Sequence, residues 1–515
     1  MTRETGLALA RDPSLQWDFL VIGGGASGLG AALEAASRGY RTLLVEKFDF
    51  GKGTSSRSSK LIHGGVRYLR QGQIHLVREA LRERWLLLRN APHLVQPLSF
   101  VVPLYRNWEI PWVFFGLRLY EGLSGPHRLG RVGLLNRQET IERLPPLRTD
   151  GLRGGVLYWD AEFDDARLAI SLFRTIEDVG GVALNGVELL AFQKRSGRIA
   201  GGILLDRLSG REFPISARIV VNAAGIFSDQ IRSLDEPGTA PKLALSRGSH
   251  LVLPKSFLPG RDALLIPKTS DGRVLFLIPW MDRVLLGTTE IPVEGPEETP
   301  RISPEEAALL RSESSRYLSA SFEALASFSG LRPLLTQSGE KSRSHLSREH
   351  SIFSSPSGLI TLAGGKWTTY RRMGEECIDF AERLHGLPHR PSKSSTLPLH
   401  GAQGEESDSS RSVYGSERKA IDRLAAEEPG ASEPLHPALP YTFAEILWGI
   451  REERALCLED LLARRTRTLF LDARAAIEAA PRVADLLARE LGRSPTWREA
   501  ELASFQKAAQ AYLPP

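Results

Sequence analysis

Three glycines near the start of the chain, Gly23, Gly25 and Gly28, have the spacing of a phosphate-binding turn. Gly23 suits a tight turn off a strand, Gly25 lets the backbone approach a pyrophosphate, and Gly28 lets a helix pack closely on a sheet. The helix that follows, starting near Ala26 and Ser27, would point its N–H groups at the phosphates. The spacing therefore predicts a site for a cofactor that carries a pyrophosphate.

The stretches on either side of the glycines are the elements that must position them. Phe19–Ile22 is an apolar strand that leads into the turn, and Thr42–Glu46 is a second apolar strand after a helix of small residues. Glu46 lies 46 − 25 = 21 residues after Gly25, where a ribose-binding acid is expected. This order predicts a βαβ dinucleotide-binding unit. The alternative is an ordinary turn in an α/β domain, and the glycines alone do not separate NAD from FAD.

A glycine- and serine-rich segment, Thr54–Arg67, follows directly. Its hydroxyls offer many hydrogen-bond partners, and Gly64 with its neighbour permits close approach of a flat ligand. If the segment is helical, Lys60, His63 and Arg67 would lie on one side of it. A solvated surface loop is the alternative, but its place after the cofactor strands favours a binding segment.

Two further segments bring cationic groups and small residues. Arg332 lies between backbone-restricting neighbours in Ser329–Pro333, and Lys366 follows two glycines before a predicted helix. Arginine binds phosphate or carboxylate in bidentate fashion. The predicted strand 218–222 ends on small residues at Ala224 and Gly225, which suits a cofactor lying across the sheet edge. Each signal alone also fits a surface charge or a buried strand, but together they indicate an anion site.

The composition sets the general class of protein. The chain has 515 residues, 42% of them hydrophobic and 25% charged, which is typical of a globular protein of two or three domains. Its two cysteines, Cys377 and Cys457, have neither disulfide-framework nor metal-ligand spacing. No secretory signal and no membrane-spanning run is predicted. The net charge of +5 favours anionic partners such as phosphates or lipid headgroups, without indicating nucleic acid.

Periodicity and composition divide the chain into four parts. Residues 1–16 are expected to be a loose leader, 17–388 interleaved cofactor and substrate domains, 389–419 a Ser- and Pro-rich linker or mobile loop, and 420–515 a helical domain. Strands are predicted at 249–253, 273–279 and 283–289, as an antiparallel sheet. Helices are predicted at 75–89, 367–384, 445–463, 471–480 and 482–491.

The chain resembles the FAD-dependent glycerol-3-phosphate dehydrogenases, within the wider D-amino-acid-oxidase-like flavoprotein group, from about Asp18 to about Ala503. The most specific motif is Thr54–Leu69, with its Ser-Ser-Lys-Leu-Ile-His-Gly-Gly run. The other matching motifs are Gly23–Gly28, Asp164–Leu168, Gly248–His250, Ile278–Asp282, Gly287–Thr289, Ser329–Pro333, Gly364–Arg371 and Leu458–Arg467. The resemblance implies an α/β FAD-binding Rossmann-like domain interleaved with a substrate domain on an antiparallel sheet, plus an all-α C-terminal domain.

The resemblance implies oxidation of sn-glycerol 3-phosphate at C2 to dihydroxyacetone phosphate, with hydride transfer to N5 of FAD and a base that takes the hydroxyl proton. His63 and His250 are the histidines nearest the matched site, and the sequence leaves open which one acts as the base. Arg332 would orient C2 as well as bind phosphate. The implied substrate-binding residues are Arg67, Tyr68, Arg332, Arg348 and Lys366, with the shortest match at Arg348.

The same resemblance implies the cofactor contacts, and no metal site is expected. Glu46 would hold the adenosine ribose. The implied FAD-binding residues are Gly23, Gly25, Ala26, Ser27, Gly28, Glu46, Lys47, Thr54, Ser55, Ser59, Lys60, Leu61, His63, Gly64, Ala224, Gly225, Gly365, Lys366, Trp367 and Thr368. The chain departs from the family pattern at Lys52, Gly53 and Arg57, and at Ile226–Phe227 where Pro-Trp is common; these departures affect the surroundings of the cofactor.

In respiratory members of the family the electron acceptor is a membrane quinone, ubiquinone or menaquinone. The aromatic stretch Trp108–Tyr120, with Arg106 and Arg118 at its flanks, suits a membrane surface, although a packed helix is the alternative. The basic cluster of Arg464, Arg465 and Arg467 fits lipid contact, a solvated face or interdomain ion pairing. We expect a cytoplasmic enzyme attached peripherally to the inner face of the cell membrane. A soluble, oxygen-using oxidase, another flavoprotein of this fold or a non-enzymatic flavin protein are the alternatives, and a homodimer is an open expectation.

Overall fold

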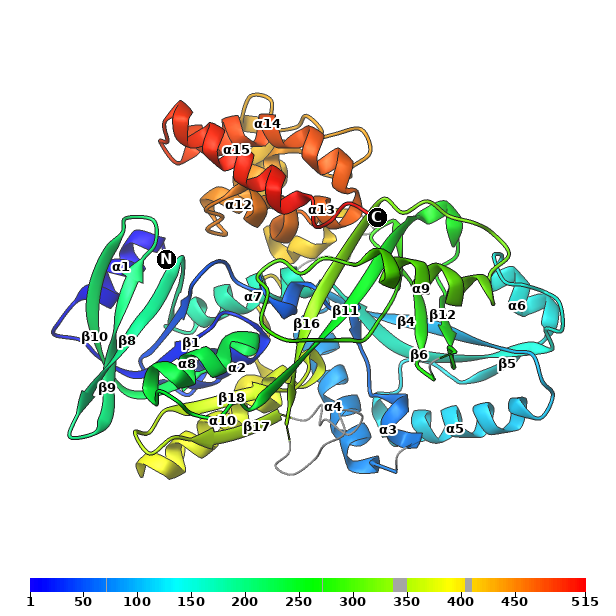
Figure 1. Ribbon diagram of the computed structural model, residues 1–515, viewed down its shortest axis with the longest axis horizontal. Coiled ribbons are helices and arrows are strands. Elements are labelled where there is room, and N and C mark those ends of the chain that lie inside the picture. The colour runs from blue at the N-terminus through cyan, green and yellow to red at the C-terminus, as the bar shows by residue number, and fades with distance from the viewer. Residues whose placement is uncertain (71, 271, 337–349, 403–409) are drawn as a thin grey trace.

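A computed structural model describes residues 1–70, 72–270, 272–336, 350–402 and 410–515. Two β-sheets lie side by side, and a helical C-terminal unit packs over the region where they meet (Figure 1). The first sheet has eight strands and the second ten. The predicted architecture, an α/β domain interleaved with a domain on an antiparallel sheet and followed by helices, is confirmed.

The first sheet is built around the predicted βαβ unit, with the order β17–β18–β10–β1–β2–β7. Its strands β1, β2, β7, β10 and β18 are parallel, while β17 pairs antiparallel with β18 and the β8–β9 hairpin extends from β10. The strands are β1 (Gln16–Ile22), β2 (Thr42–Glu46), β7 (Val182–Asn185), β8 (Val187–Arg195), β9 (Arg198–Asp206), β10 (Arg211–Asn222), β17 (His350–Ser354) and β18 (Ile360–Gly364).

Both faces of this sheet are buried along residues 19–22 of β1 and 43–45 of β2, and these residues are apolar at every position. Phe19 and Val21 of β1 pack with helices α2 (Ala26–Ser37), α7 (Asp165–Asp178) and α10 (Tyr370–His385). Leu20 and Ile22 point to the other face, toward the β8–β10 strands and α1 (Arg3–Arg11). The parallel strands therefore end at one edge, where the glycine turn lies.

The N-terminal residues differ from the expectation of a loose leader. Residues 3–11 form helix α1, which buries Leu7 and Ala10 against the sheet. Arg3 donates to Asp206 at 2.7 Å, and this ion pair is buried at both ends. The leader prediction is therefore wrong for this segment, because its apolar residues recur at helical spacing that the charges and prolines around them concealed.

The second sheet has the order β15–β11–β14–β13–β12–β4–β6–β3, with β16 on β11 and β5 on β6. All its pairs are antiparallel except β4 with β12. Its strands are β3 (Leu61–Ile62), β4 (Val95–Leu104), β5 (Gly133–Leu135), β6 (Gly154–Phe163), β11 (Leu243–Pro254), β12 (Ala263–Ile266), β13 (Leu275–Trp280), β14 (Arg283–Gly287), β15 (Ile291–Val293) and β16 (Ala326–Leu335). The predicted antiparallel sheet is confirmed.

Helices between the strands cover the sheets. Helix α4 coincides with the predicted helix 75–89, and α5 carries the aromatic stretch. The Thr54–Arg67 segment is not one helix: it contains a turn at Thr54–Ser56, strand β3 and the start of α3, so Lys60 and His63 do not share a helical face with Arg67. The remaining helices are α3 (Val66–Arg70), α4 (Ile74–Asn90), α5 (Glu109–Leu123), α6 (Arg137–Arg143), α8 (Ser228–Asp235) and α9 (Pro304–Ser315).

The C-terminal unit consists of helices, as predicted, but their limits differ. The expected helix 445–463 is broken after Arg451, where Arg454 adopts a left-handed φ of 55°. The two helices expected at 471–480 and 482–491 form one helix, α14, which continues through Pro481. The helices are α11 (Arg418–Glu427), α12 (Phe443–Arg451), a π-helical turn (Asp460–Arg465), α13 (Thr468–Leu471), α14 (Ala473–Glu490) and α15 (Pro495–Ala509).

Part of the predicted linker 389–419 packs on the first domain. Ser394 and Leu399 are buried, and Leu399 N–H donates to Asn90 O at 2.8 Å. The basic cluster is also inside the protein: Arg464, Arg465 and Arg467 are at most 1% exposed. Interdomain ion pairing is therefore the correct interpretation of this cluster. In the described parts of the chain, no helix combines the length and apolarity needed to cross a bilayer.

Candidate active site

The glycine turn has the geometry that its sequence predicts. Gly23 has φ +109°, and a Cβ there would lie 2.6 Å from Ala223 O. A Cβ on Gly28 would lie 1.9 Å from Gly23 O, so the helix can approach the turn only because this side chain is absent. Gly25 is the N-cap of α2 and supplies no side-chain cap. Backbone N–H groups at the start of α2 can therefore bind an anion.

Glu46 lies at the end of β2 beside this turn. Its Oε2 accepts a hydrogen bond from Gly24 N–H at 2.6 Å, and its Oε1 accepts one from Phe48 N–H at 2.9 Å. Burial raises the pKa of this carboxyl above its ordinary value, although both backbone bonds favour the charged form. The carboxylate thus braces the glycine turn, and its predicted role toward a ribose remains a proposal.

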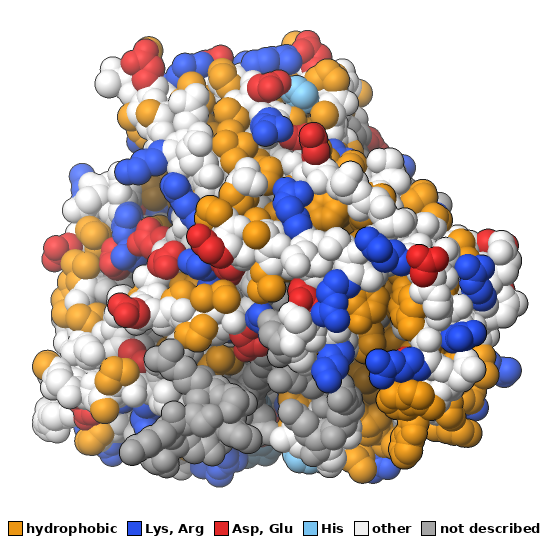
Figure 2. Space-filling view, turned by 45° about the vertical axis from the view of Figure 1, so that its right-hand side comes forward, with side chains coloured by type: hydrophobic (Ala, Val, Ile, Leu, Met, Phe, Trp, Pro, Cys, Tyr) orange, Lys and Arg blue, Asp and Glu red, His pale blue; other side chains and the backbone are white. Residues whose placement is uncertain are grey.

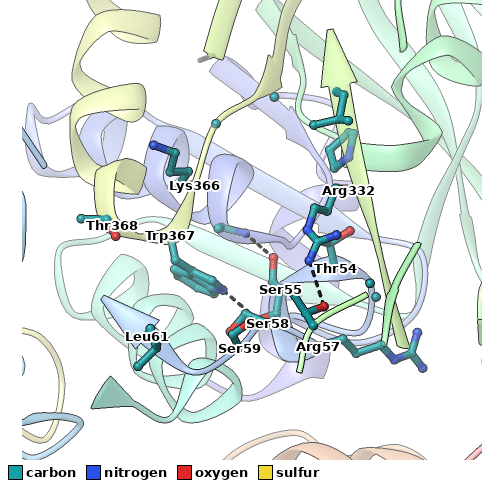
Figure 3. Close-up of a pocket in the computed structure, with 18 of the residues that line it drawn as sticks. Thr54, Ser55, Arg57, Ser58, Ser59, Leu61, Arg332, Lys366, Trp367 and Thr368 are labelled. Carbon is teal, nitrogen blue, oxygen red and sulfur yellow. Dashed lines mark hydrogen bonds between the residues drawn. The ribbon is translucent and has the colours of Figure 1, made fainter. Parts of the chain in front are cut away.

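The Ser-rich turn is fastened to three other elements. Ser55 Oγ accepts a bond from Ala26 N–H at 2.9 Å, at the start of α2. Trp367 Nε1 donates to Ser55 O at 2.8 Å, which connects the turn to the segment before α10 (Figure 3). Thr54 Oγ1 donates to Leu331 O on β16. The turn therefore joins the cofactor domain to the second sheet, and only the tertiary fold could create these contacts.

Three of the predicted contacts lie behind the cavity wall. Lys60 is fully buried, and its Nζ donates to Asp165 Oδ2 at 2.6 Å, so it does not line the cavity. Gly64 is also buried, and its N–H donates to Tyr120 Oη at 2.8 Å. Gly28 shapes the turn from within α2 without facing the cavity. The Lys60 side chain and Gly64 therefore lie behind the cavity lining, and their contact with the cofactor stays a prediction.

Two of the predicted cations, Arg332 and Lys366, line the same cavity. Arg332 on β16 donates from Nη2 to Thr288 Oγ1 at 3.1 Å and from Nη1 to Thr289 O at 3.3 Å. The Lys366 ammonium lies 3.8 Å from the centre of the Tyr68 ring. Figure 3 shows Arg332 and Lys366 entering from different chain segments, with the Thr54–Ser59 turn below and between them. The two cations can attract a small anion into the cavity.

For the other two predicted cations, Arg67 and Arg348, the structure describes no side-chain position relative to the cavity. Arg67 lies in α3, one residue before Tyr68, but its side chain is outside what the structure describes. Arg348 lies outside the described residues altogether. Thr288 and Thr289 were missed as site residues, although they belong to the Gly287–Thr289 motif. No periodicity distinguishes them; their role follows from the pairing of β11 with both β14 and β16.

Both candidate histidines line the cavity. His250 on β11 is 2% exposed, its Nε2 is 2.9 Å from Ser59 Oγ, and its ring stacks on Phe328 with centroids 4.7 Å apart. Burial, reinforced by Arg332 and Lys60, lowers the pKa of His250 well below its ordinary value, so the ring is neutral at pH 7. His63 is held by its backbone, whose N–H donates to Thr368 Oγ1 at 3.3 Å.

One cavity of about 1270 Å³ connects all these groups. It exceeds the roughly 300–1,000 Å³ of a typical small-ligand site, as a dinucleotide plus a second ligand requires. The predicted residues that line it are Gly23, Gly25, Ala26, Ser27, Glu46, Lys47, Thr54, Ser55, Ser59, Leu61, His63, Tyr68, Ala224, Gly225, His250, Arg332, Gly365, Lys366, Trp367 and Thr368. Ile226 and Phe227, where the sequence departs from its family pattern, also line it.

These features fit FAD. The glycine cradle and the N–H groups of α2 after Ala26 can hold a pyrophosphate, and small residues at Ala224 and Gly225 leave room along the sheet edge. A second helical start, at Trp367–Thr369 before α10, has Lys366 as its N-cap and no side-chain cap bond. Its N–H groups can stabilise negative charge at the far end of the cavity.

Comparison with known proteins identifies the family. Residues 18–371 match the family described as FAD dependent oxidoreductase, and residues 359–499 match the C-terminal domain of alpha-glycerophosphate oxidase. The mitochondrial glycerol-3-phosphate dehydrogenase of Mus musculus is 38% identical over 526 residues, covering 95% of this chain and 72% of that protein. The Homo sapiens protein is 37% identical and covers 98% of this chain and 75% of its own length.

Solved structures agree with the sequence relatives. A glycerol-3-phosphate dehydrogenase from Bacillus halodurans, in complex with FAD, has a TM-score of 0.81 and 28% identity, covering 99% of this chain and 97% of that one. Glycine oxidase from Geobacillus kaustophilus shares the fold, with a TM-score of 0.55 and 20% identity over 72% of this chain and 95% of that one. Fold, cofactor cradle and relatives agree: the chain belongs to the FAD-dependent glycerol-3-phosphate dehydrogenase family.

Proposed function

We propose that the protein oxidises sn-glycerol 3-phosphate to dihydroxyacetone phosphate and passes the electrons to a membrane quinone. The observation that carries the proposal is one continuous cavity in which a cofactor cradle leads to Arg332 and Lys366. A flavoprotein for an amino acid would need fewer cations at this end. The names of the relatives support the same substrate.

Arg332 and Lys366 bind the phosphate in this proposal. The two bonds to Thr288 and Thr289 fix the plane of the Arg332 guanidinium, so little side-chain entropy is lost when it binds an oxyanion. Lys366 supplies a point charge, and Tyr68 supports its side chain. Phosphate held at these two groups positions the glycerol part over the cofactor region.

His250 is the proposed proton acceptor. Its neutral ring can take the proton of the C2 hydroxyl, and the contact with Ser59 Oγ fixes the orientation of that ring. FAD, when bound, accepts the hydride from C2. N–H groups at the helical start Trp367–Thr369 favour the negative charge that this transfer creates. His63 is the second candidate base and is compared directly with His250 below.

Helix α5 supports the quinone and membrane parts of the proposal. Trp108, Trp112, Phe115 and Leu119 recur on one face and are 53–77% exposed. Figure 2 shows hydrophobic side chains bordered by Lys and Arg at the lower right, the end where Figure 1 places α5. The inner residues of α5, Val113 and Leu117, line the same cavity as the cofactor cradle, which gives an apolar acceptor a route from a lipid surface.

An absorbance experiment tests the proposal. The purified protein should show a flavin spectrum that bleaches on addition of glycerol 3-phosphate without oxygen. Return of colour with a quinone analogue supports the dehydrogenase, whereas equally fast return with oxygen supports an oxidase, the activity named in the match to the C-terminal domain. A flavin that glycerol 3-phosphate never bleaches refutes the proposed substrate. His250→Gln and His63→Gln, compared for bleaching rate, identify the base.

We also propose a peripheral location at the cytoplasmic face of the cell membrane, and the exposed aromatic residues of α5 support the membrane contact. Binding of the FAD-loaded protein to anionic vesicles, measured by co-sedimentation, should be strong at low salt and should require the exposed aromatic residues of α5. A protein that stays in the supernatant at low salt would contradict peripheral attachment without affecting the assignment of the substrate.

A further inference from the structure

A group of buried charges lies directly behind the Ser59–His250 contact. Lys60, Asp165 and Arg467 are all 0% exposed. Asp165 Oδ2 accepts from Lys60 Nζ at 2.6 Å, and Asp165 Oδ1 accepts from Arg467 Nη2 at 3.1 Å. Lys60 Nζ and Arg467 Nη2 also both donate to Ser56 O, at 2.8 and 3.0 Å. The proposed reaction uses none of these groups.

The buried charges fix the backbone on both sides of Ser59. Asp165 Oδ2 accepts from Ser58 N–H at 3.0 Å and from Ser58 Oγ at 2.7 Å, in addition to Lys60 Nζ. Lys60 has a left-handed φ of 59°, which a non-glycine residue adopts only when its surroundings hold it. Ser59, between these two anchored residues, directs its Oγ to His250 Nε2 on the cavity side.

An aromatic path reaches the same histidine from the other side. His250 stacks on Phe328, whose ring is 4.9 Å from that of Phe470 in α13. The Arg467 guanidinium lies 4.0 Å from the Phe470 ring centre, and Lys60 Nζ lies 4.9 Å from that of Phe328. Charges and rings thus form one packed unit around His250.

The two outermost members of this unit belong to the helical C-terminal domain. Arg467 and Phe470 lie at and just after the left-handed start of α13, where Arg467 has φ 60°. Neither residue lines the cavity. Their groups reach the active site through Asp165, Ser56, Lys60 and Phe328. Phe470 also packs on Tyr512, whose Oη accepts a hydrogen bond from Arg57 of the cavity wall. Both residues therefore act on the reaction by positioning.

We propose that the C-terminal domain is a positioning element of the active site: Arg467 and Phe470 hold Ser58–Lys60 and Phe328 so that Ser59 and the ring of His250 keep their places in the cavity. The kinetic part of this inference rests on the proposed function, in which His250 accepts the proton. Displacement of a reacting group by about 1 Å can slow a reaction by about 10²-fold, and this is the effect expected when the support is removed.

Two variants of the full-length, FAD-loaded protein test the proposal. Arg467→Lys keeps a cation but loses the planar guanidinium whose Nη2 donates to both Ser56 and Asp165. Phe470→Leu keeps an apolar side chain but removes the ring beside Phe328 and is the safer variant for folding. The matched control is Glu453→Gln, which breaks another buried interdomain ion pair, that with Arg167 at 2.6 Å.

Two kinds of measurement are made on each variant. Anaerobic flavin reduction gives the rate constant at saturating glycerol 3-phosphate and the Kd of that substrate. Hydrogen–deuterium exchange is followed in peptides covering residues 56–61 and 246–252. Arg467→Lys and Phe470→Leu should slow flavin reduction by about 10²-fold, with the substrate Kd and FAD content retained, and should speed exchange in both peptides. Glu453→Gln should lower thermal stability without either change.

Either of two results would overturn the positioning role: unchanged reduction and exchange in both test variants, or an equal loss in the Glu453→Gln control. If glycerol 3-phosphate fails to reduce the unaltered protein, the proposed function fails instead. Exchange then decides the inference by itself. Faster exchange around Ser59 and His250 in the two test variants alone supports it, and uniform exchange across all variants refutes it.

Discussion

Replacing Arg332 by methionine is the sharpest test of the proposed phosphate site. Methionine matches the apolar part of the arginine side chain, so the packing on β16 is retained while the guanidinium is removed. In the protein the guanidinium is held by Thr288 and Thr289 at 3.1 and 3.3 Å, which presents a fixed, planar donor fork to the cavity. The variant therefore removes a preorganised anion contact together with the two hydrogen bonds that orient it.

The size of the effect follows from the bonds that the guanidinium can make. A hydrogen bond to a charged group contributes about 1.5–3 kcal/mol, and a bidentate contact supplies two. Because Arg332 is only partly buried, water compensates for some of the loss, and we take the lower end, about 3 kcal/mol. The expected fall in kcat/KM for glycerol 3-phosphate is about 10²-fold. Arg332→Lys, which keeps the charge without the fork, should lose about tenfold.

The assay is anaerobic flavin reduction with two substrates, glycerol 3-phosphate and glycerol. If Arg332 binds the phosphate, Arg332→Met should slow reduction by the phosphorylated substrate and leave the slow reaction with glycerol nearly unchanged. Arg143→Met, which removes an arginine of a partly exposed ion pair with Asp262, is the control for general damage. Equal losses with both substrates would refute the phosphate assignment and place Arg332 at the reacting carbon or in the fold.

Three further predictions concern the base, the cradle and the membrane face. If His250 is the base, flavin reduction is lost only as the pH falls well below 6.5, because burial beside Arg332 and Lys60 lowers the pKa of His250. His250→Gln should abolish this loss at low pH and slow reduction by about 10²–10⁴-fold. A loss of activity that begins above pH 7 would exclude His250 as the base. Gly28→Ala places a Cβ 1.9 Å from a backbone oxygen and should yield protein without flavin; normal FAD content on absorbance would contradict the cradle. The double variant Trp108→Ser with Phe115→Ser should weaken binding to anionic vesicles by about tenfold or more, while flavin reduction is retained. Replacement of the exposed Leu208 by serine is the control. Unchanged co-sedimentation of the double variant would show that α5 does not contact the membrane.

Local patterns in the sequence predicted the cofactor half of the site well. The Gly23–Gly28 turn, the strands around it and Glu46 are contiguous, and each residue has a role that depends on backbone geometry within one βαβ unit. The antiparallel strands of the second sheet were predicted because each carries its own apolar pattern. Such short-range features require no knowledge of distant partners.

The sequence was least informative where a residue's environment depends on distant chain segments. Lys60 was placed in the cofactor wall from its motif, but Asp165, 105 residues further along, holds its ammonium behind that wall. The basic run Arg464–Arg467 fitted an exposed, solvated surface. Its arginines instead form buried ion pairs with Asp49 and Asp165. A charge is expected outside unless a partner is supplied, and sequence spacing alone does not show where the partner lies.

The sequence by itself determined the family motifs, the cofactor cradle and the types of group that could bind an anion. Only the tertiary structure decided which of those groups meet. It showed that Arg332 donates a hydrogen bond to Thr288, that Ser59 contacts His250, and that Arg467 of the last domain donates to Ser56 O, three residues before Ser59. The physical reason is that backbone turns are encoded within a few residues, whereas hydrogen bonds and ion pairs between sheets and domains exist only after the whole chain has packed.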